Sequence, residues 1–579
     1  MNVPNSMNLT TALPKPLAKV REVLECVRRR AAFLLAGKEI KSITWESGSL
    51  ADIRPTLTRP VFSHHSNVDF PSESAGAPAH SKTLALGFMH LPMNAPARGT
   101  PGEGTGPTRC RQGPLTRRFG FTGTRRELFR EYLAPTPAMV ALLLLCATGL
   151  ASAAKRPPAK GIEVTYPPAL PGGKSFVSDK TKEFLTAPDS LQKGVAIAKT
   201  PPTVDLLYYP GQTYAGKPWS VWGDSLAVNG RCYSAIGDHL APQGNAFVFE
   251  YDPTTRKFRQ LTDVKKLLGL PAGHYMPGKI HSRIDLGSDG WLYFSTHRGS
   301  TKVTTDEFHY TGDWILRAHP ASGKSEIVAR GAVPKHCLPA SVMDPKRMIF
   351  YAGSAPGSKD DPLGIQFLAY DVRKRKVLYS GPDGPARALM FSPSTGRIYF
   401  NPEKDDSALM RFDPDKGGPP VRLEKNIGVR AASAETPQGI IYTVSQGQGG
   451  SESTLFAFNP KTESVEELAA VAVGTQQYVT SLDADPTGRF LYYVPGAHGG
   501  AEKDGTPIVQ FDIRTKTRKV LAFLEPFYTK NYGVTLRGTY GLAVDPAGDK
   551  LYITWNANRG SRAWDTCALT VIHIPKSER

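Results

Sequence analysis

The chain has 579 residues and a formal net charge of +19, and 40% of its residues are hydrophobic. Residues 1–138 carry 19 Lys and Arg against 10 Asp and Glu, so only ten of these excess positive charges belong to residues 139–579. This mild excess, without the dense basic runs or basic helix of a nucleic-acid-binding protein, argues against that class.

Six cysteines are present, but no CxxC or CxxCH motif occurs, which argues against a zinc ribbon, a thioredoxin-like motif and c-type haem. Only Cys232, Cys337 and Cys567 lie beyond the first 154 residues. We expect them to be small buried hydrophobic residues with at most one disulfide among them.

Residues 1–127 show no sustained helix or strand period and are rich in Pro, Ala, Ser and scattered Arg. Such a segment buries too little apolar surface to offset the entropy of ordering it, so we expect disorder here. Residues 128–154 then have the parts of a secretory signal peptide: flanking arginines, an apolar run from Met139 to Leu150 and the small residues Ala151–Ala154.

This signal peptide predicts a secreted or periplasmic protein that is cleaved near Ala153 or Ala154 and has no transmembrane span in its mature form, because the apolar run is too short. Since a signal peptide works at an N-terminus, our hypothesis is that translation starts between Leu128 and Met139. Residues 1–127 would then be upstream sequence assigned to the protein in error.

Residues 155–200 contain several Pro and Gly and are interpreted as a linker that packs on the surface of the following domain. The alternative is a short helix around Thr181 to Leu191.

Residues 201–579 form a repeat domain in which two kinds of segment alternate, seven of each, at spacings of 42 to 67 residues. The first kind is a turn followed by an apolar strand, as in SDGWLYFSTH, and its seven copies align Tyr233, Tyr293, Phe350, Tyr399, Tyr442, Tyr492 and Tyr552. The second is a strand that runs into a turn, as in FVFEYDPTTRK. Periods of this length with four short strands per unit are typical of a β-propeller.

The predicted fold is therefore all-β, a seven-bladed β-propeller. In the first six units a further strand follows the second segment, but the seventh unit ends at Lys576–Arg579 without one. An unpaired sheet edge is a liability, and TVDLLYY at Thr203–Tyr209 can supply the missing strand and close the ring. The alternatives are a pair of β-sandwiches or a ring of six or eight blades.

The second unit carries the richest polar chemistry, in HSRIDLGSDGWLYFSTHR at His281–Arg298. His281 and Arg283 lie two residues apart and face the same way on a strand. A tight turn at Asp289–Gly290 and an antiparallel return strand bring His297 and Arg298 back to the same end.

In a propeller the innermost strands line a central channel, and the loops that lead into them gather at one face. Six of the seven units place a cation, a His or a Tyr there. We predict His281, His297, Tyr478 and Tyr540 as catalytic residues, and as substrate-binding residues Arg283, Arg298, His336, Arg387, Arg430, Arg537 and Trp219.

Converging positive charges in a concave site attract an anionic ligand, and Arg matches a carboxylate with two parallel hydrogen bonds. β-Elimination from a uronic acid needs an Arg to neutralise the carboxylate, a His as base and a Tyr as acid. Two alternatives stay open. In the first, the cations only satisfy carbonyls and carboxylates of the channel itself. In the second, His281, His297 and His336 hold a divalent metal, which no HxH or HExxH motif supports.

With His on an inner strand, His at the end of the next strand and Arg and Tyr nearby, the chain resembles the propeller polysaccharide lyases of the ulvan and oligogalacturonate lyase families. The resemblance implies cleavage of an acidic polysaccharide or oligosaccharide at the funnel. The Gln-and-His metal set of the oligogalacturonate lyases has no counterpart that we can place. The alternative function is a non-catalytic propeller that binds glycan or protein, and we expect a monomer in either case.

Overall fold

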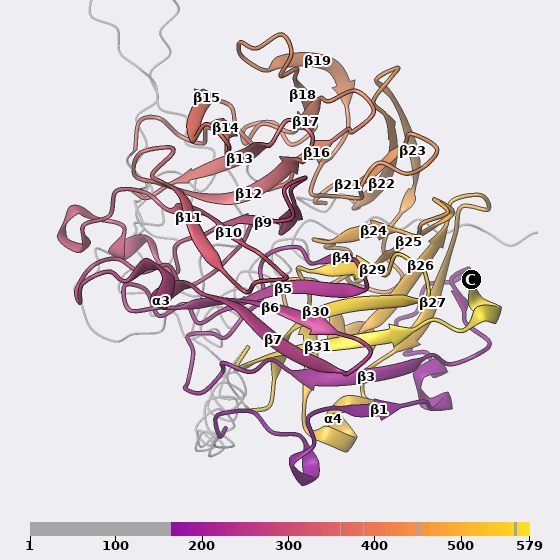
Figure 1. Ribbon diagram of the computed structural model, residues 1–579. Coiled ribbons are helices and arrows are strands. Elements are labelled where there is room, and N and C mark those ends of the chain that lie inside the picture. The colour runs from indigo at the N-terminus through magenta and orange to yellow at the C-terminus, as the bar shows by residue number, and fades with distance from the viewer. Residues whose placement is uncertain (1–163, 359–360, 386, 448–451, 561–563) are drawn as a thin grey trace, which may run out of the picture. The chain divides into compact units, whose positions relative to one another are not determined.

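The computed structural model describes residues 164–579 apart from 359–360, 386, 448–451 and 561–563 (Figure 1). The expected disordered segment, the signal peptide and the proposed translation start lie outside the described residues.

Seven antiparallel sheets follow one another along the described chain, which makes the protein a seven-bladed β-propeller (Figure 1). Six blades each take four consecutive strands, from the innermost outwards. Their bounds are β4 (Leu226–Val228), β5 (Arg231–Gly237), β6 (Ala246–Asp252) and β7 (Lys257–Asp263); β8 (Asp285–Leu286), β9 (Leu292–Ser295), β10 (Trp314–Ala318) and β11 (Ser325–Arg330); β12 (His336–Asp344), β13 (Ile349–Pro356), β14 (Phe367–Asp371) and β15 (Lys376–Gly381); β16 (Met390–Phe391), β17 (Ile398–Phe400), β18 (Ala408–Phe412) and β19 (Val421–Asn426); β20 (Ala431–Ala432), β21 (Ile441–Val444), β22 (Thr454–Asn459) and β23 (Ser464–Ala470); β24 (Leu482–Ala484), β25 (Phe490–Tyr493), β26 (Pro507–Asp512) and β27 (Thr517–Phe523).

The seventh blade combines strands from both ends of the described chain. Its inner edge is split into β28 (Thr535–Gly538) and β29 (Leu542–Val544), which both pair with β30 (Lys550–Asn558), and β30 pairs with β31 (Thr566–His573). The strand expected to fill the outer place is β3 (Thr203–Tyr208), and it pairs antiparallel with β31 over all six of its residues. Figure 1 shows β3 in purple beside the yellow β31. The innermost strand β29 contacts both β24 and β4, so blades six, seven and one are neighbours.

Residues 164–200 pack on the outer edges of blades six and seven. β1 (Val177–Asp179) adds to β3, and β2 (Ala196–Ile197) pairs with β27 in parallel. Between them, the 3₁₀ helix η2 (Lys182–Leu185) begins after Thr181, whose hydroxyl accepts the backbone N–H of Glu183. Phe184 of this turn is fully buried against Phe527. The segment is thus a surface-packed connection that also contains a short helical turn.

Helical structure is sparse in the described residues. The two α-helices are α3 (Val264–Leu268) and α4 (Phe527–Tyr532), and the remaining 3₁₀ turns are η1 (Pro171–Gly173), η3 (Thr301–Val303), η4 (Asp306–Phe308), η5 (Ala501–Asp504) and η6 (Lys576–Glu578). Over the part of the chain that is described, none of these helices is long and apolar enough to cross a membrane.

The seven aromatic residues aligned by the repeat occupy the second strand of their blades, and each is at most 5% exposed. Buried aromatic side chains contribute large apolar areas, and here they lie between neighbouring sheets. Tyr293, for example, packs with Met343 and Phe350 of the next blade. The three described cysteines are also buried, and no disulfide joins them.

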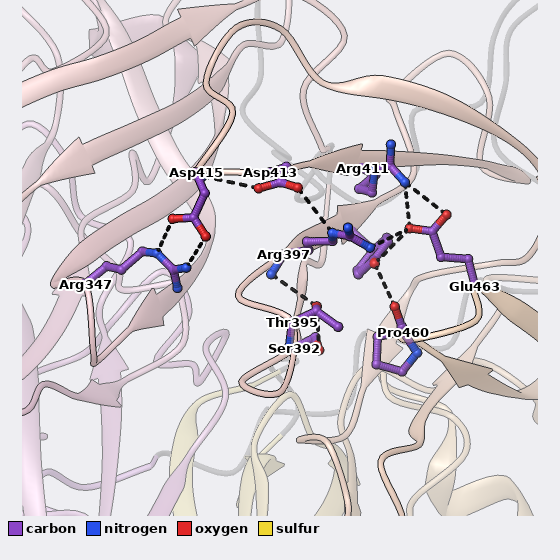
Figure 2. A network of polar contacts seen from close by, with 10 residues as sticks. Arg347, Ser392, Thr395, Arg397, Arg411, Asp413, Asp415, Pro460 and Glu463 are labelled. Atoms are coloured by element: carbon purple, nitrogen blue, oxygen red, sulfur yellow. Dashed lines mark hydrogen bonds and ion pairs between the residues drawn. The ribbon is translucent and has the colours of Figure 1, made fainter.

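Ion pairs link neighbouring blades where strands meet their turns (Figure 2). Arg347 of the third blade binds Asp415 of the fourth through two hydrogen bonds of 3.1 and 2.6 Å. Glu463 of the fifth blade binds Arg411 of the fourth at 2.9 Å and Arg397 at 3.4 Å. Because the Glu463 side chain is only 18% exposed, these contacts are less screened than ordinary surface pairs.

Candidate functional site

Loops that lead into the innermost strands converge on one cavity, as expected for a propeller. Trp222, His281, Arg387, Arg430 and Tyr540 come from five different blades, and each precedes its inner strand by one to four residues. The cavity has a volume of about 40 Å³, which is room for roughly three water molecules. It is the floor of a funnel rather than a pocket for a whole sugar ring.

Trp222 lines the cavity and packs against several other rings of the funnel. Its ring is nearly parallel to that of His281, with centroids 5.8 Å apart, and its centroid lies 4.7 Å from that of Tyr540. The indole Nε1 donates a hydrogen bond of 2.6 Å to Nε2 of His239, which is therefore the acceptor nitrogen of that ring. Trp564 closes the other side, with a centroid distance of 5.5 Å.

His281 and His297 lie side by side, with ring centroids 5.4 Å apart. The bridge between Lys279 and His297 and the pairing of β8 with β9 produce this proximity, as the predicted hairpin requires. Nδ1 of His281 donates to the Pro339 carbonyl at 2.9 Å, and Nδ1 of His297 donates to the Arg298 carbonyl at 2.6 Å. Because a carbonyl only accepts, Nε2 of each neutral ring keeps a lone pair.

Both histidines are kept neutral by their surroundings. Burial lowers the pKa of His281 well below its usual value, and the charges of Lys279 and Arg387 lower it further. Burial also lowers the pKa of His297, and Lys279 and Arg298 act in the same direction. In the absence of an anion, each ring is an unprotonated but weak base.

Two tyrosines complete the polar wall. The hydroxyl of Tyr540 lies 2.7 Å from Nδ1 of His498, and Nε of Arg430 donates to the hydroxyl of Tyr478 at 2.7 Å. Burial raises the pKa of Tyr540 well above its usual value, so its phenol carries a proton. Burial, with the charges of Arg430 and Arg387, lowers the pKa of His498 to about 4.

Close backbone packing places Tyr540 in the funnel. The inner edge of the seventh blade is interrupted between β28 and β29, and Tyr540 occupies that interruption. A methyl group on the neighbouring Gly541 would come within 2.9 Å of the Gly223 carbonyl oxygen and 2.7 Å of the Ser225 hydroxyl. Glycine is therefore needed for the first and seventh blades to approach at this point.

Arg283, which also lines the cavity, sits among three partly buried aspartates. Its side chain lies 3.4 Å from Asp285 and 3.8 Å from Asp224, and Asp483 adds a third negative charge. Asp285 and Asp483 each accept a backbone N–H from the inner strand of the next blade, at Met343 and Val544. Arg283 thus lines the cavity but chiefly balances carboxylates that hold the ring together.

Arg298 and His336 form a separate cluster around Cys337. Arg298 donates to Sγ of Cys337 at 2.6 Å, and Nδ1 of the fully buried His336 lies 2.6 Å from the Ser354 hydroxyl. Neither residue lines the cavity. Within the described parts of the chain, no group of three or more His, Cys, Asp or Glu side chains could hold a metal ion. His281, His297 and His336 therefore do not gather into a metal site.

Two further residues predicted to bind substrate, Trp219 and Arg537, also lie away from the cavity. Trp219 is fully buried in the apolar core and donates to the Tyr214 carbonyl at 2.7 Å. Arg537 is neutralised by Glu502, with hydrogen bonds of 2.9 and 2.6 Å. The aromatic surface of the funnel comes instead from Trp222, which lies in the same repeat segment as Trp219, and from Trp564, for which no repeat position gave a signal.

No protein-family model matches the chain, and no curated protein matches it. Matching solved structures include an oligogalacturonate lyase in complex with manganese, with a TM-score of 0.45, 13% identity and coverage of 72% of this chain and 99% of the other. An oligogalacturonate lyase from Vibrio parahaemolyticus has a TM-score of 0.44, 11% identity and coverage of 73% and 100%. A chain of the mitotic checkpoint complex has a TM-score of 0.41, 12% identity and coverage of 67% and 97%. At these identities and TM-scores, the matches assign no activity to this chain.

Proposed function

We propose that the funnel binds an acidic carbohydrate and that the protein cleaves uronic-acid polysaccharide by β-elimination. One observation carries the proposal: neutral histidines, a protonated tyrosine and arginines meet in one site. The ring centroid of His281 lies 5.4 Å from that of His297 and 6.2 Å from that of Tyr540. These separations are short enough for one sugar residue at the mouth of the funnel to face all three groups.

The chemistry uses the groups in the states described above. Nε2 of His281 or His297 takes the proton from C5 of the uronate, and the electrons of that bond form the C4–C5 double bond. The bond from C4 to the glycosidic oxygen breaks, and the hydroxyl of Tyr540 or Tyr478 supplies the proton to that oxygen. Arg387 and Arg430 pair with the carboxylate and stabilise the negative charge that develops there.

Substrate binding would also raise the lowered pKa of the histidines and so make them stronger bases. The positive charges of Lys279 and Arg387 contribute to the lowered pKa of His281. A bound carboxylate offsets those charges, so it raises the pKa of His281 towards the range in which a general base is effective. The base is then activated only when the correct ligand is present.

The test is the ultraviolet absorbance of unsaturated uronates during incubation with a panel of uronic-acid polysaccharides, with and without divalent metal and chelator. We expect absorbance to rise with the wild-type protein and not with His281→Ala or His297→Ala. His319→Ala is the matched control, because His319 lies in the turn between β10 and β11 of the same blade and should retain activity. A loss of activity equal in all three variants would contradict the assignment of the site.

The second candidate is a non-catalytic propeller that binds an acidic glycan or a protein at the same funnel. The small cavity favours it, since about 40 Å³ excludes a sugar ring from the floor. Retention on an acidic glycan column without any rise in absorbance would support this candidate. Under both candidate functions we propose that the protein is secreted or periplasmic, on the basis of the apolar run and small residues at 139–154. We also propose that it is a monomer.

A further inference from the structure

The turn between β14 and β15 of the third blade carries four consecutive cations. Residues Arg373–Lys376 are all exposed, and the exposed Val377 and Leu378 follow them at the start of β15. The run is shorter than the roughly five to eight basic residues typical of nucleic-acid-binding segments. It nevertheless concentrates four positive charges on one turn of the surface.

The carboxylate of Asp371 holds this turn in place. One of its oxygens accepts the backbone N–H groups of Arg373 and Lys374, at 3.0 and 2.8 Å, and the other lies 3.7 Å from Nζ of Lys374. Within the described ranges, neither Arg375 nor Lys376 forms an ion pair with a carboxylate. The turn is therefore ordered, and its positive charges outnumber the carboxylate that binds it.

Carboxylates on the turns of the neighbouring blades are engaged with other arginines. Asp289 of the second blade lies 3.7 Å from Arg317, and Asp415 of the fourth blade lies 2.6 Å from Arg347. The excess of positive charge on the turn at 373–376 is thus not removed by ion pairs with these blades.

The equivalent turn of the sixth blade is basic too, but its cations are paired. Lys516 has the same left-handed backbone as Arg375, with φ of 54° against 52°, and its Nζ lies 2.8 Å from Glu466. Lys519 of the same turn region pairs with Glu578 at 2.9 Å. The exposed, unpaired cations of the third blade are therefore not a general property of this kind of turn.

Aliphatic side chains are exposed beside these cations. Val377 is 36% and Leu378 47% exposed, and Val421, which begins the outer strand β19 of the fourth blade, is 52% exposed. The contact between Arg347 and Asp415 shows that turns of the third and fourth blades are neighbours (Figure 2). Positive charges next to exposed aliphatic side chains are the two features that attach a protein to the surface of an anionic membrane.

This surface lies on the face opposite the funnel. Successive strands of a blade run in opposite directions, so the turn from the third to the fourth strand lies at the other end of the blade from the loop that enters the first strand. The funnel residues come from those entry loops. A partner bound at the turns therefore leaves the funnel open.

We propose that Arg373–Leu378, with Val421, attaches the protein to a membrane surface rich in anionic lipid headgroups. The phosphate groups of such a surface complement the cations, and the aliphatic side chains enter the boundary between headgroups and acyl chains. An acidic glycan also attracts cations, but it offers no apolar phase for these side chains, which favours the lipid. The inference is independent of lyase chemistry, because none of these residues lines the cavity.

Co-sedimentation of the full-length protein with vesicles tests the attachment. Vesicles of phosphatidylglycerol and phosphatidylcholine in equal parts are compared with phosphatidylcholine alone. We expect the protein to bind the mixed vesicles, and to bind them less tightly in high salt. Each cation near an anionic surface strengthens binding about fivefold, so the double variant Arg375→Gln with Lys376→Gln should bind about 25-fold more weakly. Leu378→Ala should bind at least about threefold more weakly.

Lys516→Gln is the matched control. It removes the same charge from the equivalent turn of the sixth blade, where Lys516 already pairs with Glu466, so vesicle binding should not change. Every variant keeps the rest of the full-length chain, so any binding by other segments is common to all of them. Circular dichroism and thermal unfolding establish that each variant folds.

Equal binding to both kinds of vesicle would overturn the proposal, as would equal losses in the double variant and in Lys516→Gln. Hydrogen exchange locates the contact: mixed vesicles should protect residues 371–380, and protection of the funnel loops alone would also overturn it. Should the double variant lose retention on a polygalacturonate column while its vesicle binding is unchanged, the surface is a glycan site and the lipid assignment is wrong. Weaker vesicle binding with an unchanged uronate assay supports this inference and leaves the lyase proposal untouched.

Discussion

Closure of the ring through β3 makes Leu206 a sensitive position. The Leu206 side chain is fully buried, and it packs in one apolar cluster with residues of the sixth and seventh blades such as Leu551 and Ile572. On the backbone, Leu206 is paired with Thr570 of β31 on one side and Val177 of β1 on the other. Leu206→Ala therefore opens a cavity in the sheet that joins the two ends of the propeller.

Leu→Ala substitutions at fully buried sites cost about 2–5 kcal/mol, because the transfer energy of the lost atoms adds to the cost of the cavity. We expect about 3 kcal/mol here. For roughly 380 residues that unfold together, the entropy of unfolding is about 0.8 kcal/mol per kelvin, so the melting temperature should fall by about 4 °C. The matched control is Leu378→Ala in the outer strand β15, where the leucine is 47% exposed and the change should stay within about 0.5 kcal/mol.

Differential scanning calorimetry, with denaturant unfolding for the free energy, compares the two variants with the wild-type protein. A single transition at lower temperature for Leu206→Ala, with no shift for Leu378→Ala, is the expected result. Equal melting temperatures for both variants would refute the reasoning, because β3 would then contribute no more to the ring than an exposed edge residue.

Three further outcomes follow from the described contacts. Glu463→Gln should destabilise the protein by about 1–2 kcal/mol, since Arg411 loses its anionic partner, and the difference should shrink in high salt; a salt-independent loss would contradict the ion-pair account. Burial raises the pKa of Asp313 from 3.8 to about 7. The contribution of Asp313 to the free energy of unfolding is therefore fully present below pH 3.8 and is lost as the pH rises through about 7. Asp313→Asn does not ionise, so its free energy of unfolding, measured with denaturant, should lack this pH dependence. In the uronate assay, Tyr540→Phe should lower kcat by about a hundredfold with little change in KM, and an unchanged kcat would exclude Tyr540 as the acid.

The fold could be predicted almost entirely from the sequence, because its signals are local. Each blade needs a turn, an apolar strand, a second strand and a further turn, and residues within about 30 positions specify these by their period and turn composition. The aligned aromatic positions, from Tyr233 to Tyr552, are all buried for this reason. The missing outer strand of the seventh unit likewise pointed to Thr203–Tyr209, of which β3 takes Thr203–Tyr208.

The candidate site was only partly predictable, because its contacts join residues far apart in the chain. The sequence placed His281, His297, Arg387, Arg430, Tyr478 and Tyr540 at the loops of one face, and the structure brings them together. Local spacing does not show which cation is neutralised, and Glu502 takes this role for Arg537. Nor does it distinguish Trp219, which points into the core, from Trp222, which faces the funnel.

The sequence by itself thus determined the number of blades and the face on which polar side chains gather, since strand period and turn chemistry act over short distances. Only the tertiary structure decided which of those side chains meet. Ring closure sets the first blade against the seventh, and so places Trp222 beside Tyr540 and Tyr540 beside His498. Burial among arginines then gives these groups their protonation states, because charge and desolvation depend on every neighbour in space rather than on neighbours in the chain.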